Sequence, residues 1–265
     1  MKKNAFIIVV VILLAISGCK SKKEIAVTPG GTAKDVYEQA KKYVKKDPEK
    51  ARVLFKEVMQ LYPTSVYAGL AKIGIADSYY KDKDAASLIL AAAEYQEFVN
   101  LYPQSPDAAY ASYQIGMSYY RQIKRPGRDQ TNTASALKYF ELTVQQFPDT
   151  KEAEEAKKNI ARTRDHLADH NFRIGLANYR LKAYKGAIDR FKEVIDNYPE
   201  FSGNDKTFFY TGITYFAMKD YDSAISFFQG VINNYPKSKY LKKAQKMIEK
   251  ANKQKTRKKK VGRKE

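Results

Sequence analysis

The sequence predicts an all-α protein, a solenoid of five helix pairs with a closing helix at the C-terminal end. The first observation is a pattern with five copies: Ala, then Phe or Tyr four residues later, then an aromatic residue and Pro seven residues after that. The copies are Ala51/Phe55/Tyr62-Pro63, Ala91/Tyr95/Tyr102-Pro103, Ala136/Phe140/Phe147-Pro148, Ala187/Phe191/Tyr198-Pro199 and Ala224/Phe228/Tyr235-Pro236. The second is that successive prolines lie 40, 45, 51 and 37 residues apart while the pattern itself is constant. One structural unit copied with insertions in its loops gives such a sequence.

The pattern describes the second helix of each pair. Offsets of four and eleven residues place the Ala and both aromatic side chains on one face of an α-helix. Proline cannot continue a helix and disfavours helical geometry at the residue before it. Each of these helices is therefore expected to end at the aromatic residue before its proline.

The first helix of each pair has a small residue followed three positions later by Tyr. The copies are Ala40/Tyr43, Ala76/Tyr79, Gly116/Tyr119 and Gly212/Tyr215, whereas the fourth unit has Gly175 and Asn178. Together with the second-helix pattern, this resembles the tetratricopeptide repeat over about residues 33 to 250. We expect helix pairs at about 33–62, 66–102, 106–147, 152–198 and 204–235, and a closing helix at about 238–253.

The first residues have the features of a secretory signal. Lys2 and Lys3 precede an apolar run from 5 to 16, which at twelve residues is too short to span a bilayer. The stretch 16–19, which ends in the only cysteine, Cys19, resembles the lipobox of bacterial lipoproteins. This predicts a signal peptide at 1–18 and, at 19–32, a lipidated N-terminus with a flexible tether. The resemblance implies a diacylglycerol and an N-acyl chain on Cys19 and, because Lys20 is not Asp, an outer-membrane location facing the periplasm.

The predicted array divides into an N-terminal module of three repeats (33–148) and a C-terminal module of two repeats and the cap (149–253). A basic tail at 254–265 is expected to be disordered, because the stretch 250–265 contains nine basic residues and one acidic residue. Contact with anionic lipid or an acidic partner and a solvated tail without a partner both remain open. We expect no nucleic-acid role in an exported protein.

Two irregularities in the array carry a more specific resemblance. A polar insertion lies at 124–132, and residues 152–181 contain no proline, which predicts one helix of about eight turns. With the stretches 162–170 and 184–191, the chain resembles the BamD family of outer-membrane lipoproteins. That resemblance implies a scaffold of the β-barrel assembly machinery that binds the C-terminal segments of unfolded outer-membrane proteins and docks on a periplasmic POTRA domain of BamA.

The first helices of a tetratricopeptide array line its concave surface, so residues near each small residue are expected to form a peptide-binding groove. Tyrosine offers contact area and a hydrogen-bonding tip at low entropic cost. The candidates in the first three repeats are Tyr37, Lys41, Ile73, Asp77, Tyr80, Tyr113, Met117 and Tyr120. Alternatively, several of these rings only pack between repeats. For docking to BamA the resemblance nominates Arg190, whose guanidinium can pair with a partner carboxylate or locally with Glu193.

No catalytic motif is found, so we expect no enzyme. His166 and His170 share a helix face but lack a third ligand in a matching motif, so no metal and no cofactor beyond the covalent lipid is predicted. Three other functions remain open: a pilotin-like lipoprotein for secretin or type IV pilus assembly, a tetratricopeptide protein of the envelope-constriction system, and a hydrolase accessory whose basic tail binds anionic polymers.

Overall fold

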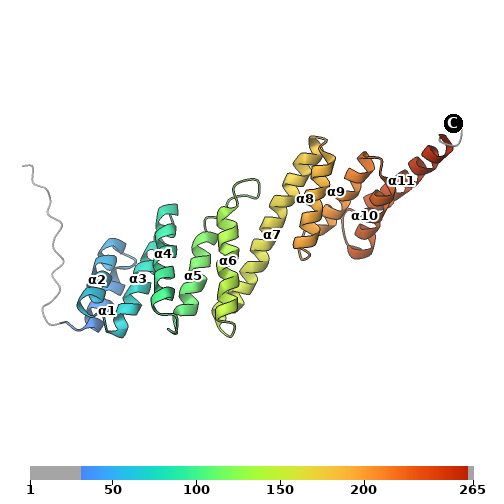
Figure 1. Ribbon diagram of the computed structural model, residues 1–265. Helices are drawn as coiled ribbons and strands as arrows, with labels where there is room; N and C mark the ends of the chain where they lie inside the picture. Colours follow the sequence, from blue (N-terminus) through green and yellow to red (C-terminus); the bar gives the residue numbers. More distant parts are fainter. Residues whose placement is uncertain (1–30, 262–265) are drawn as a thin grey trace, which may run out of the picture.

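The computed structural model describes residues 31–261, and within them the fold is all-helical. The predicted signal peptide and Cys19 lie outside the described residues. The helices run from end to end of an elongated array (Figure 1). They are α1 (Ala33–Tyr43), α2 (Pro48–Leu61), α3 (Val66–Asp82), α4 (Ala85–Leu101), α5 (Ala108–Tyr120), α6 (Thr131–Gln146), α7 (Lys151–Arg180), α8 (Tyr184–Asn197), α9 (Asn204–Ala217), α10 (Tyr221–Asn234) and α11 (Leu241–Val261).

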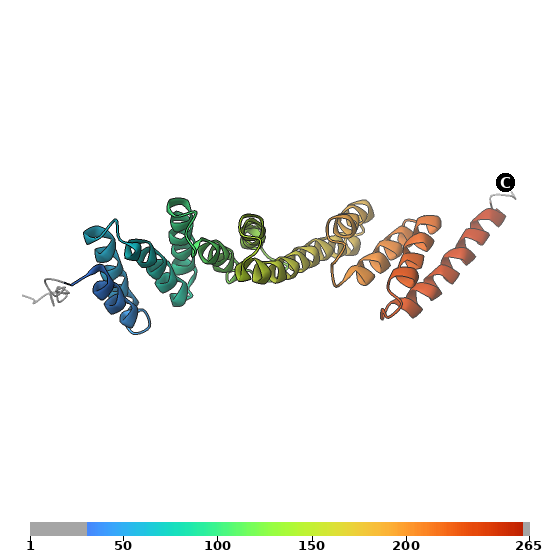
Figure 2. The ribbon, with the colours of Figure 1, turned by 90° about the horizontal axis from the view of Figure 1, so that it is seen from below.

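Each helix packs mainly against the helices before and after it in the chain, as in a solenoid. Viewed from below, the five pairs follow one another along one direction, with α1 at one end and α11 at the other (Figure 2). The predicted solenoid of five pairs and a closing helix is therefore confirmed for residues 31–261.

The second helices end where the prolines predict. The residue before each proline has φ between −130° and −133° and is the helix C-cap; these residues are Tyr62, Tyr102, Phe147, Tyr198 and Tyr235. The starts of several helices are likewise determined by neighbouring residues. The side chains of Thr32, Asp47 and Asp84 accept hydrogen bonds from the first-turn backbone of α1, α2 and α4. Thr32 and Asp35 form a capping box.

The two helices of a pair are joined through a ring and a small residue. The five pattern alanines are fully buried. In the last three repeats the second-helix ring lies directly on the glycine of the first helix: a Cβ on Gly116 would lie 2.6 Å from Phe140, one on Gly175 2.6 Å from Phe191, and one on Gly212 2.7 Å from Phe228. Glycine is needed there because a larger residue would displace the ring.

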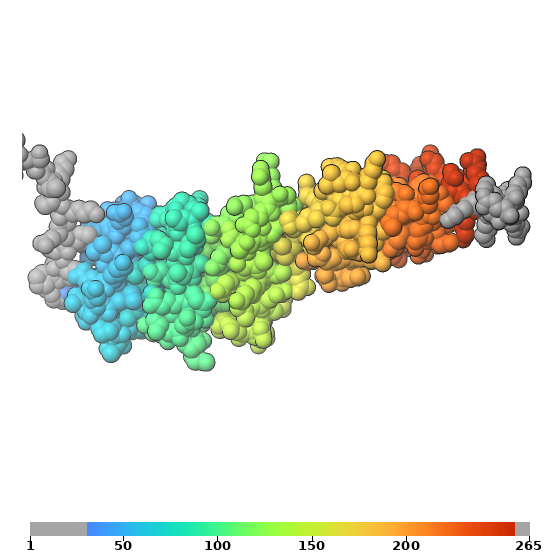
Figure 3. Space-filling model, turned by 45° about the horizontal axis from the view of Figure 1, so that its top comes forward, coloured from blue at the N-terminus to red at the C-terminus, as the bar shows by residue number. Residues whose placement is uncertain are grey.

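Helix α7 joins the two halves of the array. Its 30 residues give a length of roughly 45 Å, and its bounds confirm the long helix expected at 152–181. Its first half belongs to the core around Phe140 through Ala156, and its second half to the core around Phe191 through Ala168 and Phe172. The same continuous helix therefore contributes side chains to the cores of both halves. The insertion between α5 and α6 projects from the body (Figure 3).

The C-terminal boundary differs from expectation. The closing helix runs to Val261 rather than ending at 253, so most of the tail expected to be disordered is helical. The reason is that Lys, Arg and Gln are good helix formers and the first glycine of this stretch is Gly262. Charge density alone was therefore a poor guide to where the helix ends.

Candidate functional site

A cavity of about 380 Å³ lies where the first two repeats meet the start of the third. It is lined from α1, α2, α3 and α5 by apolar, tyrosine and charged side chains of both signs, together with one glycine: Tyr37, Lys41, Val44, Phe55, Leu70, Ile73, Gly74, Asp77, Lys81, Asp107 and Tyr110. Four of the eight predicted groove residues are brought together here, namely Tyr37, Lys41, Ile73 and Asp77. We call this the inter-repeat cavity.

The polar wall of the inter-repeat cavity is organised by Asp77. One of its carboxylate oxygens accepts hydrogen bonds from the Tyr95 hydroxyl at 2.5 Å and the Tyr110 hydroxyl at 2.8 Å. Burial and then the neighbouring Asp77 carboxylate raise the pKa of Tyr95 and of Tyr110 above that of free tyrosine. Both hydroxyls therefore stay protonated donors, which fixes three helices (α3, α4 and α5) around one carboxylate.

The apolar wall is made by close approach of α2 to α3. The ring of Phe55 lies against Gly74, where a Cβ would be only 2.4 Å from the ring. Tyr37 packs on Phe55 with ring centroids 5.7 Å apart, and burial raises the pKa of Tyr37. The amine of Lys41 lies 5.4 Å from the Tyr37 ring centroid at the exposed edge of the cavity. An apolar floor beside a lysine suits an extended chain with an aromatic side chain and a carboxylate.

The other four predicted groove residues do not line this cavity. The guanidinium of Arg121 covers Tyr80, lying 3.7 Å from its ring centroid. Tyr113 and Tyr120 pack on Phe140, with ring centroids 5.7 Å and 5.9 Å away. Met117 belongs to the same packed cluster, which α7 closes through Ala156 and Ile160. These rings mostly fill the space between repeats.

Sequence reasoning missed Asp107 and Tyr110, which α5 contributes to the cavity. Both lie in or just before the first turn of α5, six or more residues before Gly116. The groove prediction covers only residues within about one turn of each small residue, and the first turn of α5 lies outside that range. The aromatic Tyr110 on the same helix face as Tyr113 was the available signal.

Arg190 lies on the exposed face of α8. Its Nη1 donates to Glu193 Oε2 at 2.8 Å, and the other oxygen of Glu193 accepts from Asn171 of α7 at 3.2 Å. The guanidinium is thus held by an exposed local pair, the alternative that its sequence position left open. Such a pair is weak and can be exchanged for a partner carboxylate at little cost.

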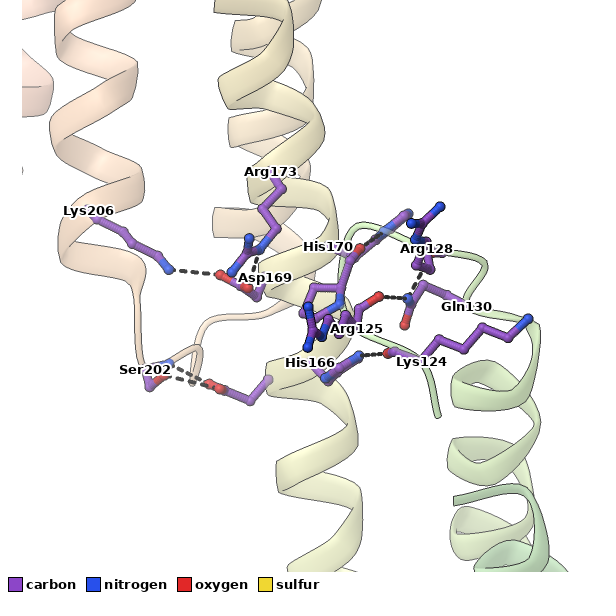
Figure 4. A network of polar contacts seen from close by, with 12 residues as sticks. Lys124, Arg125, Arg128, Gln130, His166, Asp169, His170, Arg173, Ser202 and Lys206 are labelled. Carbon is purple, nitrogen blue, oxygen red and sulfur yellow. Dashed lines mark hydrogen bonds and ion pairs between the residues drawn. The ribbon is translucent and has the colours of Figure 1, made fainter. Parts of the chain in front are cut away.

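The two histidines hold the insertion onto α7 (Figure 4). His166 Nε2 lies 2.8 Å from the Lys124 carbonyl oxygen, and His170 Nδ1 bonds the Pro126 carbonyl oxygen. Because a carbonyl oxygen only accepts, both ring nitrogens donate. Within residues 31–261 no group of three His, Cys, Asp or Glu side chains could hold a metal ion. The contacts that the two histidines make join the insertion to α7.

The next α7 side chains bind the following repeat. Asp165 accepts from the backbone N–H of Ser202 at 2.7 Å and from its hydroxyl at 3.1 Å. Asp169 pairs with Lys206 of α9 at 2.9 Å and with Arg173 at 2.7 Å. Over one stretch, 165–173, α7 thus contacts the insertion on one side and the fourth-to-fifth repeat connection on the other (Figure 4).

The sequence of this chain matches a known protein family. Residues 29–223 match the family described as YfiO, outer membrane lipoprotein. The chain belongs to the YfiO/BamD family. A relative, the outer membrane protein assembly factor BamD of Rickettsia prowazekii (strain Madrid E), is 31% identical over 195 residues, covering 71% of this chain and 74% of the relative. The family match ends within α10, so α11 lies beyond the part of the chain that it covers.

Among solved structures, this YfiO/BamD chain is similar to the TPR2AB domain of yeast Sti1, with 11% identity, a TM-score of 0.37, and coverage of 83% of this chain and 98% of that one. It is also similar to a tetratricopeptide repeat protein from Parabacteroides merdae, with 13% identity, a TM-score of 0.35, and coverage of 85% and 75%. Along residues 31–261, no helix combines the length and the apolar character that a membrane span requires.

Proposed function

We propose that this protein is an outer-membrane assembly factor that binds extended segments of unfolded β-barrel proteins in the inter-repeat cavity. The observation that carries the proposal is the meeting of Tyr37, Lys41, Ile73 and Asp77 with Tyr110 around one cavity. Membership of the YfiO/BamD family and the assembly-factor relative support the cellular task. Lipidation of Cys19 would hold the protein at the outer membrane, facing the periplasm.

The cavity fits the C-terminal segment of a barrel protein, which ends in an aromatic residue and a free carboxylate. The ring would contact Phe55 and Ile73, and the carboxylate would approach Lys41 and Lys81, both of which line the cavity. Binding and positioning are all that this task needs, so no residue is assigned a catalytic role.

The second half of the proposal concerns the partner. The C-terminal module would dock on a POTRA domain of BamA, with Arg190 exchanging Glu193 for a partner carboxylate. A guanidinium can make two parallel hydrogen bonds to a carboxylate, which gives such a contact geometric specificity. The cavity lies on α1, α2, α3 and α5, and the docking side chain lies on α8, so one chain can hold a substrate and a partner at once.

Charge reversal at the cavity edge tests substrate binding. Lys41→Glu should weaken binding of a labelled peptide ending in Phe by up to about fivefold in fluorescence anisotropy, because a surface ion pair contributes up to about 1 kcal/mol. Lys42→Glu is the matched control, because Lys42 belongs to the same helix but lines the outer hollow of α1 instead. Equal affinities of the two variants would remove the cavity from the proposal.

Docking is tested separately by co-purification of a large POTRA-containing barrel protein. Arg190→Glu should reduce its recovery, and Lys192→Glu, two residues away and thus on another face of α8, should not. Depletion in cells then tests the function as a whole. Intact barrel-protein levels with failed secretin or pilus assembly would show that the protein serves another envelope system.

A further inference from the structure

The outward side of α11 carries a dense positive charge. The helix packs on α9 and α10 through Ala244, Met247 and Ile248. Its other faces carry exposed cations, namely Lys242, Lys243, Lys246, Lys250, Lys253 and Arg257. Between 241 and 257 the one acidic residue is Glu249, and among the described side chains of α11 the single salt bridge joins Lys255 to Asp222 of α10.

Capping the array does not explain this charge. A cap needs a polar outer face, which alternating Lys and Glu would supply with favourable pairs four residues apart. Here Lys242, Lys246 and Lys250 follow one another at that spacing, so like charges repel along the helix. From 237 to 265 the sequence has fourteen basic and two acidic residues. A helix that carries this repulsion is suited to an anionic ligand.

The residue types distinguish a lipid surface from a protein partner. Eight of the nine cations between 237 and 257 are lysines. Lysine is a flexible point charge, whereas protein interfaces are depleted in lysine and enriched in arginine and aromatic residues. The fully exposed positions of α11 carry no large apolar side chain that could anchor a protein interface. Clusters of four to eight basic residues on one helix typically bind anionic lipid headgroups.

We propose that α11 binds the anionic phospholipid headgroups of a membrane surface. The charge lies at the end of the array opposite residue 31 (Figures 1 and 2). In the sequence, Cys19 precedes residue 31 by twelve residues. If Cys19 is lipidated, the protein contacts the membrane at both ends and the array lies along its surface. That orientation depends on the lipid attached to Cys19, whereas the binding of anionic headgroups by α11 does not depend on it.

The test uses the chain from residue 20 onward, which lacks the lipid and contains every described helix. It should co-sediment with phosphatidylcholine vesicles containing one third phosphatidylglycerol but not with phosphatidylcholine alone. Binding should be lost at about 1 M salt, where the Debye length is about 3 Å. Replacing Lys242, Lys246, Lys250 and Lys253 by Gln should lower the partition coefficient at least about 100-fold, since each lysine near an anionic surface contributes roughly fivefold.

The matched control removes four exposed lysines from the other end of the array, Lys34, Lys45, Lys46 and Lys56, again by Gln. It has the same net charge as the α11 variant and should retain binding. Circular dichroism checks that both variants fold. Equal loss in both variants, or no vesicle binding by the parent, would overturn the proposal. Binding to polyglutamate without vesicle binding would overturn it in favour of an acidic protein partner. None of these outcomes depends on the inter-repeat cavity.

Discussion

The ring of Phe140 occupies the space that a side chain at position 116 would need: a Cβ built on Gly116 would lie 2.6 Å from the Phe140 Cδ1. Both residues are fully or nearly fully buried, and the contact joins α5 to α6. The same relationship recurs between Gly175 and Phe191. Close packing of a ring on a bare backbone is therefore what fixes the register between the two helices of a repeat.

Gly116→Ala should destabilise the protein by about 1–3 kcal/mol, the usual cost of overpacking. Gly69→Ala is its control, because Gly69 is also helical but an added Cβ there meets its nearest atom at an ordinary 3.7 Å. Better helix propensity should make that variant neutral or more stable by up to about 1 kcal/mol. Urea unfolding followed by circular dichroism measures both, and a stable Gly116→Ala protein would contradict the packing argument.

The tyrosines around Asp77 should make the fold sensitive to alkali. Burial and the Asp77 carboxylate raise the pKa of Tyr95 and Tyr110 in the folded state above the value of 10.0 for free tyrosine. Above that pH the unfolded chain releases these protons while the folded chain keeps them, so stability falls as pH rises. The slope is about 1.4 kcal/mol per pH unit for each such tyrosine.

Unfolding free energies measured between pH 9 and about 11 test this, and Tyr110→Phe should reduce the slope. In absorbance titrations of the folded protein, the Tyr95 and Tyr110 hydroxyls should ionise only with unfolding. Ionisation of every tyrosine near pH 10 in a protein that remains folded would disprove the assignment.

The ion pair between Asp169 and Lys206 should contribute more than an exposed pair. Their side chains are 18% and 27% exposed, against 45% and 37% for Arg190 and Glu193. A double-mutant cycle with Asp169→Asn and Lys206→Met should give a coupling energy of about 1 kcal/mol. The cycle at Arg190 and Glu193 is the comparison and should give at most about 0.5 kcal/mol.

The same coupling has a defined pH range. Burial opposes ionisation of Asp169, but hydrogen bonds from Lys206 and Arg173 outweigh it and lower the Asp169 pKa below 3.8. The contribution should therefore be complete above about pH 4 and decline as pH falls through the lowered pKa. A coupling energy that vanishes by pH 5 would contradict the conclusion that these hydrogen bonds outweigh burial and lower the Asp169 pKa.

The histidine contacts predict that the insertion opens when they are removed. In the His166→Ala, His170→Ala variant, trypsin should cleave after Arg128 roughly 30-fold faster, because two hydrogen bonds of about 1 kcal/mol each no longer hold the insertion. Cleavage after Lys83, in the α3–α4 turn, is the internal control and should be unchanged. Adding Zn²⁺ to the parent should not protect Arg128, whereas protection would revive a metal role for the two histidines.

The helices were predictable because their signals are local. Proline ends each second helix through its own ring, whatever surrounds it. The inter-repeat cavity was only half predictable. Helix periodicity predicts the helix face on which a side chain lies, but it does not predict which neighbouring helices pack over that face. Tyr113 and Tyr120 share that face with true cavity residues, yet α7 and the Phe140 ring cover them. The partners of His166 and His170 lie 42 and 44 residues away, beyond any local pattern.

The contact between ring and glycine in the last three repeats also limits how such a chain can change during evolution. Inserting one residue within a helix turns everything after it by about 100° and moves the glycine away from its ring. Added length is compatible with the fold only outside these contacts, as in the connection between α5 and α6 at 121–130. Selection can thus lengthen the connections freely while the paired positions stay fixed, and the same connections are the sites where an engineer could graft new binding loops.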